Sequence, residues 1–283
     1  MSTYQKSILP NGIRVVTEKH SGSRALCAGL WVGTGSRDEV KGLEGVSHFL
    51  EHLVFKPSKK FSGKNGQPNI VQVLNQVGAR FNGTTWLDRT NYFVTFPAND
   101  ANLRLILDME ADRMVNANID QKDLWDPIEK KGEMTVVRNE MEGVENNPLQ
   151  ITLQRTVATA FEWHNYGKST IGARSDVENV DIERLRAFYR NYYQPDNAVL
   201  LVAGKIDEDK ALALINQTFG HIPKPTRVIK PTYTLDPVQD GERSVTVRRV
   251  GDVQILMAAY KIPAGVHADF SALAVLGQIL ADT

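Results

Sequence analysis

Hydrophobic and polar residues alternate along this chain with two periods, and the two periods separate strands from helices. Between Thr90 and Pro97 the apolar side chains fall on every second residue, which is the spacing of a strand with one buried face. Between Val46 and Phe55 they recur every three to four residues, as on an amphipathic helix. The same reading predicts strands at 13–18 and 26–33 and a second helix at 70–77, which Gly78 ends.

The next part of the chain is mostly helical by this reading. Asn99 or Asp100 can cap a helix, and Asp126-Pro127 combines a cap residue with a proline in the first turn of another. The remaining expected elements are helices at 150–190 and 211–219 and a strand at 197–202. Because hairpins and helices mix without a regular βα alternation, we predict an α+β fold in which a mostly antiparallel sheet packs against helices.

Residues 221 to 242 contain four prolines, which is typical of a linker between domains. We expect a complete first domain over 1–222, a Pro-rich linker over 223–242 and the opening of a second, related domain over 243–283. The elements expected in this last segment are strands at 244–250 and 254–260 and an apolar helix at 268–280. The order of elements over 254–280 loosely repeats that over 26–54, as in an internal repeat. No stop signal follows the last helix, so the second domain is expected to be incomplete.

Charge and composition narrow the class of function. The chain carries 33 Lys and Arg against 33 Asp and Glu, which argues against binding nucleic acid or an anionic membrane through an overall field. Its single cysteine, Cys27, excludes an intrachain disulfide framework and a cysteine-rich metal site. No run approaches the ~20 apolar residues of a membrane helix. We therefore expect neither nucleic acid nor membrane as a partner, and a soluble protein of a bacterial periplasm or cytoplasm, with the compartment left open.

The segment His48-Phe49-Leu50-Glu51-His52 carries the strongest chemical signal. On a helix of about 100° per residue, His48, Glu51 and His52 share one face, and the apolar neighbours cover the opposite face. Two histidines one turn apart can chelate a single zinc ion. The glutamate between them can take a proton from a zinc-bound water, in the reverse of the commoner zinc peptidase motif. The alternative is a solvated amphipathic helix that bears two histidines by chance.

A catalytic zinc ion needs a third protein ligand, and the helix expected from Pro127 offers two carboxylates. Glu133 and Glu140 lie at nearly the same angle on the helical wheel, inside a stripe of valines. Burying a bare carboxylate costs several kcal/mol unless a cation or hydrogen bonds compensate. A buried dication would compensate, as would a salt bridge to Arg104 or Arg113. The wheel does not choose between Glu133 and Glu140.

The HFLEH segment and the downstream EMTVVRNE together resemble the pitrilysin/insulinase family of zinc metallopeptidases, which includes the mitochondrial processing peptidases and many bacterial zinc proteases. The similarity extends over most of residues 5–222, through LPNGIRVV, GLEGVSHFLEHLVFK, GARFNGTTWLDRTNYF and NYYQPDNAVLLVAG. The resemblance implies that His48, His52 and Glu140 bind one Zn²⁺ per chain. It also implies that Glu51 is the general base and Glu133 an additional acid.

The resemblance further implies that a peptide substrate binds as an added strand on a sheet edge. The matching residues are Phe81, Asn82, Gly83 and Thr84, followed by Thr85. Main-chain hydrogen bonds to such an edge would allow broad sequence tolerance. The alternative is an ordinary edge strand with an Asn-Gly turn.

The expected function is zinc-dependent endopeptidase activity on peptides or unfolded segments. The resemblance implies a second, similar half, in the same longer chain or in a partner subunit, which often adds an Arg and a Tyr to the site. The alternatives are a non-catalytic scaffold or partner subunit of the same family, a fragment inactive without its second half, and a binding module with an adventitious metal.

Overall fold

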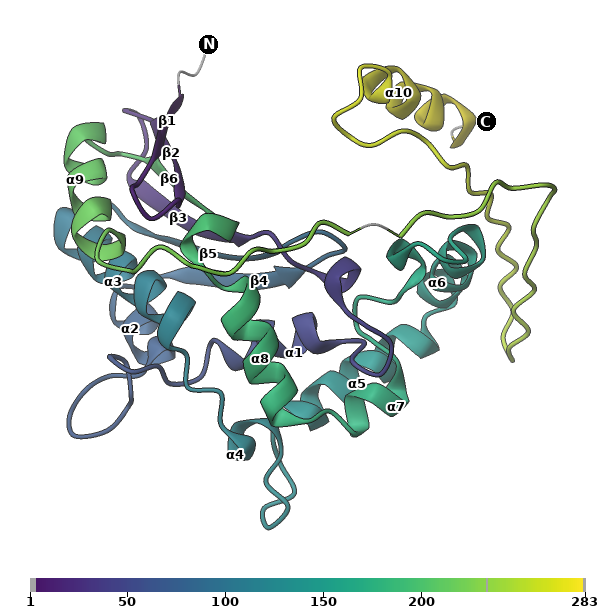
Figure 1. Cartoon of the computed structure of the whole chain (residues 1–283), viewed down its shortest axis with the longest axis horizontal. Coiled ribbons are helices and arrows are strands. Elements are labelled where there is room, and N and C mark those ends of the chain that lie inside the picture. Colours follow the sequence, from purple (N-terminus) through teal and green to yellow (C-terminus); the bar gives the residue numbers. More distant parts are fainter. Residues whose placement is uncertain (1–3, 233, 282–283) are drawn as a thin grey trace.

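The computed structural model describes residues 4–232 and 234–281, and a six-stranded sheet forms its centre (Figure 1). The strands are β1 (Tyr4–Ile8), β2 (Arg14–Lys19), β3 (Ala25–Val32), β4 (Arg80–Thr85), β5 (Thr90–Pro97) and β6 (Ala198–Gly204). They lie in the order β1-β2-β6-β3-β5-β4. Neighbouring strands are antiparallel except for the parallel pair of β2 and β6. The predicted α+β fold with a mostly antiparallel sheet is therefore confirmed.

The helices bury one face of this sheet, because the alternate residues of its central strands form the core. In β3, Leu26, Leu30 and Val32 are buried, whereas Cys27 and Trp31 on the opposite face are half-buried. The longer helices are α1 (Val46–Leu53), α2 (Ile70–Gln76), α3 (Asp100–Asn116), α5 (Glu133–Asn146), α6 (Pro148–Ala160), α8 (Ile182–Tyr192), α9 (Glu208–Phe219) and α10 (Phe270–Ala281). Shorter ones are α4 (Gln121–Leu124) and α7 (Arg174–Glu178). Helices α3 and α9 pack together beneath β2, β3 and β5, and α1 lies under β4 and β5.

Two of the helix boundaries follow from local signals in the sequence. Asn99 caps α3, its side chain accepting a hydrogen bond from the backbone N–H of Asn102 at 2.7 Å. Gly78 lies just beyond α2 with a φ of 66°, the left-handed conformation that glycine adopts most readily after a helix.

The helix predicted to start at Asp126-Pro127 is wrong. The Asp126 side chain does accept hydrogen bonds from Ile128 N and Glu129 N, as a cap would. The chain then reverses through an isolated bridge between Asp126 and Lys131, and α5 begins only at Glu133. An Asx turn and a helix cap make the same first hydrogen bonds, so the local signal does not distinguish them.

The strands predicted at 244–250 and 254–260 are also absent from the part of the chain that the structure describes. The side chains of this segment are largely exposed, with Val250 and Leu256 fully so. A two-stranded hairpin without a sheet or helix to pack on is at best marginally stable, which explains the missing ladder. The apolar helix that follows does form, as α10, yet none of its described residues is buried.

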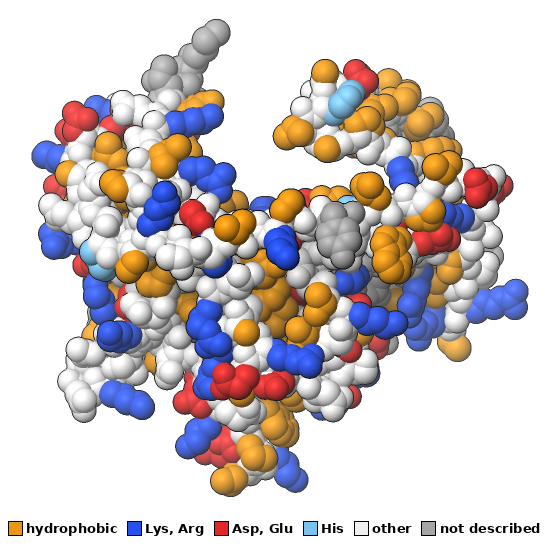
Figure 2. Space-filling model, in the orientation of Figure 1, with side chains coloured by type: hydrophobic (Ala, Val, Ile, Leu, Met, Phe, Trp, Pro, Cys, Tyr) orange, Lys and Arg blue, Asp and Glu red, His pale blue; other side chains and the backbone are white. Residues whose placement is uncertain are grey.

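The segment after α9 runs along the sheet and its helices toward α6, where Arg243 pairs with Glu162, and α10 then lies away from the sheet (Figure 1). Figure 2 shows hydrophobic side chains gathered on the α10 part of the surface. The segment 223–242 is attached to the preceding part of the chain, since Asp236 accepts hydrogen bonds from Trp163 N and His164 N at 2.9 and 2.7 Å. Among the described residues, no helix combines the length and the apolar character needed to cross a bilayer.

Candidate metal centre

Helix α1 presents the HFLEH segment as the wheel predicts. Phe49, Leu50 and Leu53 are fully buried in the core. His48, Glu51 and His52 lie on the other side of the helix, and each remains partly exposed. Burial of the apolar face therefore fixes the direction of the two imidazoles and the carboxylate between them.

A buried carboxylate from the preceding loop holds the N-terminus of α1. The helix has no capping side chain of its own, because its cap position is Gly45. The carboxylate of Glu39 instead accepts hydrogen bonds from Gly45 N and Ser47 N, both at 2.8 Å. Glu39 is 1% exposed, and burial raises its pKa to about 7 despite these two bonds.

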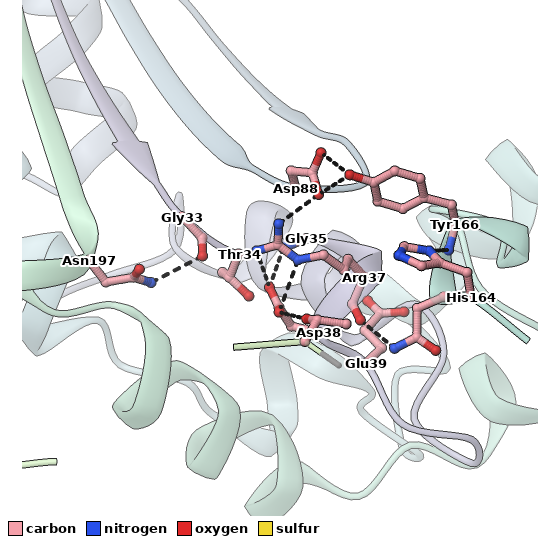
Figure 3. Close-up of polar contacts among 12 residues, drawn as sticks. Gly33, Thr34, Gly35, Arg37, Asp38, Glu39, Asp88, His164, Tyr166 and Asn197 are labelled. Atoms are coloured by element: carbon pink, nitrogen blue, oxygen red, sulfur yellow. Dashed lines mark hydrogen bonds and ion pairs between the residues drawn. The ribbon is translucent and has the colours of Figure 1, made fainter. Parts of the chain in front are cut away.

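The loop that carries Glu39 is tied to the neighbouring elements by polar contacts (Figure 3). Arg37 Nη1 lies 2.7 Å from Asp88 Oδ1 in the turn between β4 and β5. The hydroxyl of Tyr166 donates to the same carboxylate, and Asn197 Nδ2 donates to Gly33 O at 3.3 Å. The loop thus connects the start of α1 to the end of β4.

The three predicted zinc ligands converge on one point, although α5 comes from a distant part of the sequence. His48 Nε2 and His52 Nε2 are 3.3 Å apart. Glu140 Oε2 lies 3.4 Å from His48 Nε2 and 3.6 Å from His52 Nε2. Tetrahedral ligands about 2.0–2.1 Å from a zinc ion lie about 3.3–3.4 Å from one another. The donor atoms present therefore fit a single zinc ion.

Glu133 lies behind His52 instead of beside Glu140. Its Oε2 atom is 2.9 Å from His52 Nδ1, and its Oε1 atom is 2.5 Å from Lys56 Nζ. Burial alone would raise the pKa of Glu133, but the hydrogen bonds with His52 and Lys56 outweigh it and lower that pKa to about 2. The two carboxylates that the wheel placed together thus face opposite nitrogens of one imidazole.

The buried stripe of α5 differs from the predicted one. Val137 and Met141 are buried, whereas Val136 is 41% exposed and the Glu140 side chain 44% exposed. The stripe is therefore centred on Val137 and Met141, and Glu140 lies at its rim. The predicted alternative of a salt bridge to Arg104 or Arg113 is not seen for either carboxylate among the described residues, because Arg113 pairs with Glu110 and Arg104 contacts Gln217. Glu133 pairs with Lys56 instead.

The electrostatics of the imidazoles and of Glu51 suit metal and proton chemistry. Burial, together with the nearby His52, lowers the pKa of His48 to about 4, so His48 is neutral at neutral pH and able to bind a metal. Burial opposes the charged form of His52, yet the hydrogen bond with Glu133 and the carboxylates around it raise the His52 pKa. Burial raises the pKa of Glu51, which the Thr85 hydroxyl opposes by donating to Glu51 Oε2 at 2.6 Å.

The predicted substrate residues form the free edge of the sheet. Phe81, Asn82, Gly83 and Thr84 lie in β4, which among the described strands pairs with β5 alone. Asn82-Gly83 continues the strand, so the predicted alternative of a turn there is wrong. A Cβ atom on Gly83 would lie 2.9 Å from Glu51 Cγ, and the missing side chain allows the strand to approach α1.

A cleft of about 370 Å³ joins this edge to the metal centre. It is lined by Glu51, His52, Phe55, Lys56, Val71, Phe81, Asn82, Gly83, Glu133 and Glu140. Two residues that support the centre, Lys56 and Glu39, were missed in the sequence. Lys56 lies one helical turn after His52, a spacing that could have identified it, whereas nothing in the local sequence pairs Glu39 with α1.

Comparison with known proteins agrees with this geometry. The chain is 30% identical over 285 residues to the zinc protease PqqE of Helicobacter pylori, covering 99% of this chain and 61% of that protein. It is 26% identical over 247 residues to a probable mitochondrial-processing peptidase subunit beta of Arabidopsis thaliana, covering 86% and 43%. The crystal structure of a protease from Helicobacter pylori superposes with a TM-score of 0.76 at 28% identity, covering 86% of this chain and 56% of that chain.

The chain thus spans between about two fifths and three fifths of these relatives. Residues 179–283 match the family model described as Peptidase M16 inactive domain. Residues 14–174, which hold the whole candidate metal centre, match the model described as Insulinase (Peptidase family M16). Because this second match covers more than half of the sequence, the chain belongs to the insulinase family of peptidases.

Proposed function

We propose that this chain forms the catalytic half of a zinc-dependent endopeptidase. The observation that carries the proposal is the convergence of His48, His52 and Glu140 at the spacing of tetrahedral zinc ligands, next to a carboxylate and a free strand edge. All of these residues lie in the segment that matches the insulinase model, outside the segment that matches the inactive domain. A zinc ion held there would lower the pKa of a bound water and polarise the scissile carbonyl.

Glu51 is the general base in this proposal. Burial raises its pKa toward the range in which a carboxylate exchanges protons efficiently, and Thr85 fixes one of its oxygens. Glu51 would accept a proton from the attacking water and pass it to the leaving amine. Glu133 would orient His52 through the Nδ1 atom, leaving Nε2 for the metal.

The substrate would be an extended peptide that pairs with β4. The free edge of β4 and the cleft beside it are adjacent to Glu51, so a strand added there places its main chain at the general base. Main-chain pairing favours peptides and unfolded segments over folded proteins. We further propose the division into a domain over 1–222, a linker over 223–242 and a second domain beginning at 243, together with a second half that completes the enzyme.

The test compares the wild type with Glu51→Gln in the intact protein that contains this chain. We expect Glu51→Gln to bind zinc normally and to lose at least about 100-fold in kcat, the usual contribution of a general base. Exposed Glu142, on α5 but outside the cleft, supplies the control Glu142→Gln, which should keep full activity. Hydrolysis that survives in a clean Glu51→Gln preparation would refute the proposed role.

Zinc content tests the ligand set separately from activity. We expect one zinc ion per chain in the wild type, and a loss of at least about 10-fold in zinc affinity in Glu140→Gln, because one of three protein ligands loses its charge. Metal analysis after dialysis against a chelator measures both quantities. Far less than one zinc ion per chain in the wild type would favour an adventitious site, and full zinc content without hydrolysis would favour a non-catalytic relative.

A further inference from the structure

Lys56 reaches back from the end of α1 toward the metal centre. It follows His52 by four residues, and its ammonium group meets the carboxylate of Glu133 at 2.5 Å. The Glu133 side chain is 12% exposed and the Lys56 side chain 35%, and both residues line the cleft. The proposed roles of the ligands and the general base leave this lysine without a function.

Lys56 compensates negative charge around the centre. Glu51, Glu133 and Glu140 bring three negative charges within reach of one point, and a zinc ion supplies two positive ones. Lys56 supplies a third next to Glu133 and within electrostatic reach of Asp123, and so offsets part of the negative charge of the site. A partly buried site with an uncompensated charge is costly.

Lys56 also affects which of two carboxylates on α5 can bind the metal. Glu133 and Glu140 both project from α5 toward His52. Each oxygen of Glu133 already has a partner, because Oε2 meets His52 Nδ1 and Oε1 meets Lys56 Nζ. Without Lys56 one oxygen of Glu133 would lose its charged partner and could turn toward a bound metal.

We propose that Lys56 is a positioning residue that commits Glu133 to His52 and so leaves Glu140 as the third zinc ligand. The inference rests on the zinc site proposed above. His52 then donates its Nδ1 proton to Glu133 and presents the Nε2 lone pair to the metal. His48 has no such support, since its buried Nδ1 atom meets no hydrogen-bond partner among the described residues. Positioning of His52 by Lys56 and Glu133 therefore matters more for the ligand set.

The experiment compares Lys56→Met and Lys56→Arg with the wild type, in the intact protein. Lys60→Met is the matched control, because Lys60 lies on the same loop, is half exposed and pairs with Asp108, away from the cleft. Zinc affinity is measured by competition with a chromophoric chelator, and the zinc ligands are identified by X-ray absorption. Removal of a group that supports a metal ligand from behind typically weakens binding about 10- to 100-fold.

We expect a loss of this size in Lys56→Met, with an additional or exchanged oxygen ligand on the zinc. The zinc affinity of Lys56→Arg should remain within a few-fold of the wild-type value because the arginine keeps the charge. The zinc affinity of Lys60→Met should equal that of the wild type. Wild-type affinity and an unchanged ligand set in Lys56→Met would overturn the role of Lys56 while leaving the zinc site intact. An equal loss in Lys56→Arg and Lys56→Met would overturn the charge argument. A wild type that takes up no zinc would overturn the proposed metal site, and this inference with it.

Discussion

Glu39 lies outside the metal centre, yet it holds the helix that carries the centre. Its carboxylate accepts hydrogen bonds from Gly45 N at the cap position of α1 and from Ser47 N, one residue before His48. A helix of eight residues has little stability of its own, so its position depends on such anchors and on packing. The lysine ammonium of Lys168 fixes the same residue from the other side by donating to Glu39 O at 2.6 Å.

Glu39 should make the stability of the protein depend on pH. Its pKa is about 7 in the folded chain, against an ordinary value of 4.5. Because the folded state holds this proton more tightly, the stabilisation is fully present below about pH 4.5 and is lost as the pH rises through 7. Between pH 5 and pH 8 the unfolding free energy of the wild type should fall by about 2 to 3 kcal/mol because of this group. The glutamine of Glu39→Gln does not titrate, so the variant should not show this fall.

Urea unfolding of the metal-free protein at pH 5 and pH 8 measures the effect. The quantity to compare is the difference in unfolding free energy between wild type and Glu39→Gln, since all other titrating groups cancel in it. Glu142→Gln, a substitution at an exposed residue, should follow the unfolding free energy of the wild type at both pH 5 and pH 8. A wild type and a Glu39→Gln variant that change in parallel would show that Glu39 ionises normally in the folded chain.

Single residues also show how far the sequence alone could predict the site. His48, Glu51 and His52 were predictable because they lie within five residues of one helix, where periodicity fixes their common face. The choice between Glu133 and Glu140 was not predictable from the wheel, because it depends on how α5 approaches α1 and on the contact with Lys56. The family resemblance, and not the periodicity, favoured Glu140.

At the scale of elements, the pattern succeeded wherever a strand or helix packs on the core. The sheet strands β3 and β5 and the helices α2 and α9 bury the apolar residues that predicted them. The pattern failed at 244–260, where strands were predicted but the described residues pair with no strand. Periodicity indicates which face of an element could be buried. Whether the element forms depends on a neighbouring strand or helix that it can pack on.

The free edge of β4 gives a prediction about substrate peptides. Trp86 N donates to Arg89 O at the start of the hairpin, and opposed residues of an antiparallel pair alternate between bonded and non-bonded. By this alternation the main-chain groups of Phe81 and Gly83 point away from β5, toward an added strand. A peptide paired there should use the N–H groups of every second residue.

Peptides with one N-methylated amide, scanned along the sequence, test this pairing. Binding to the Glu51→Gln protein should weaken by about 3- to 10-fold at alternate positions, since a net hydrogen bond contributes about 1 kcal/mol. The intervening positions serve as internal controls and should bind like the parent peptide. Equal effects at all positions would mean that side chains, and not an added strand, carry the affinity.

At the scale of the whole molecule, residues 4–222 contain the hydrophobic core, while the side chains of the C-terminal segment are largely exposed. Helix α10 is apolar, and Val275 and Ile279 are 61% and 58% exposed. Figure 2 shows hydrophobic side chains gathered on this part of the surface, at the upper right. The chain spans 61% of the zinc protease PqqE. We propose that the second half proposed above covers α10.

Ile279→Ala distinguishes a covered helix from an exposed one. In a chain that ends at Thr283, the substitution should change the unfolding free energy by less than about 0.5 kcal/mol, as for other exposed sites. In the intact protein it should destabilise by about 2 kcal/mol or more, because a buried isoleucine loses its contacts and leaves a cavity. The amide hydrogens of α10 should also exchange more slowly in the intact protein than in the chain that ends at Thr283. If neither the stability nor the exchange differs between the two proteins, α10 stays uncovered, and the proposed second half would have to contact residues 4–222 elsewhere.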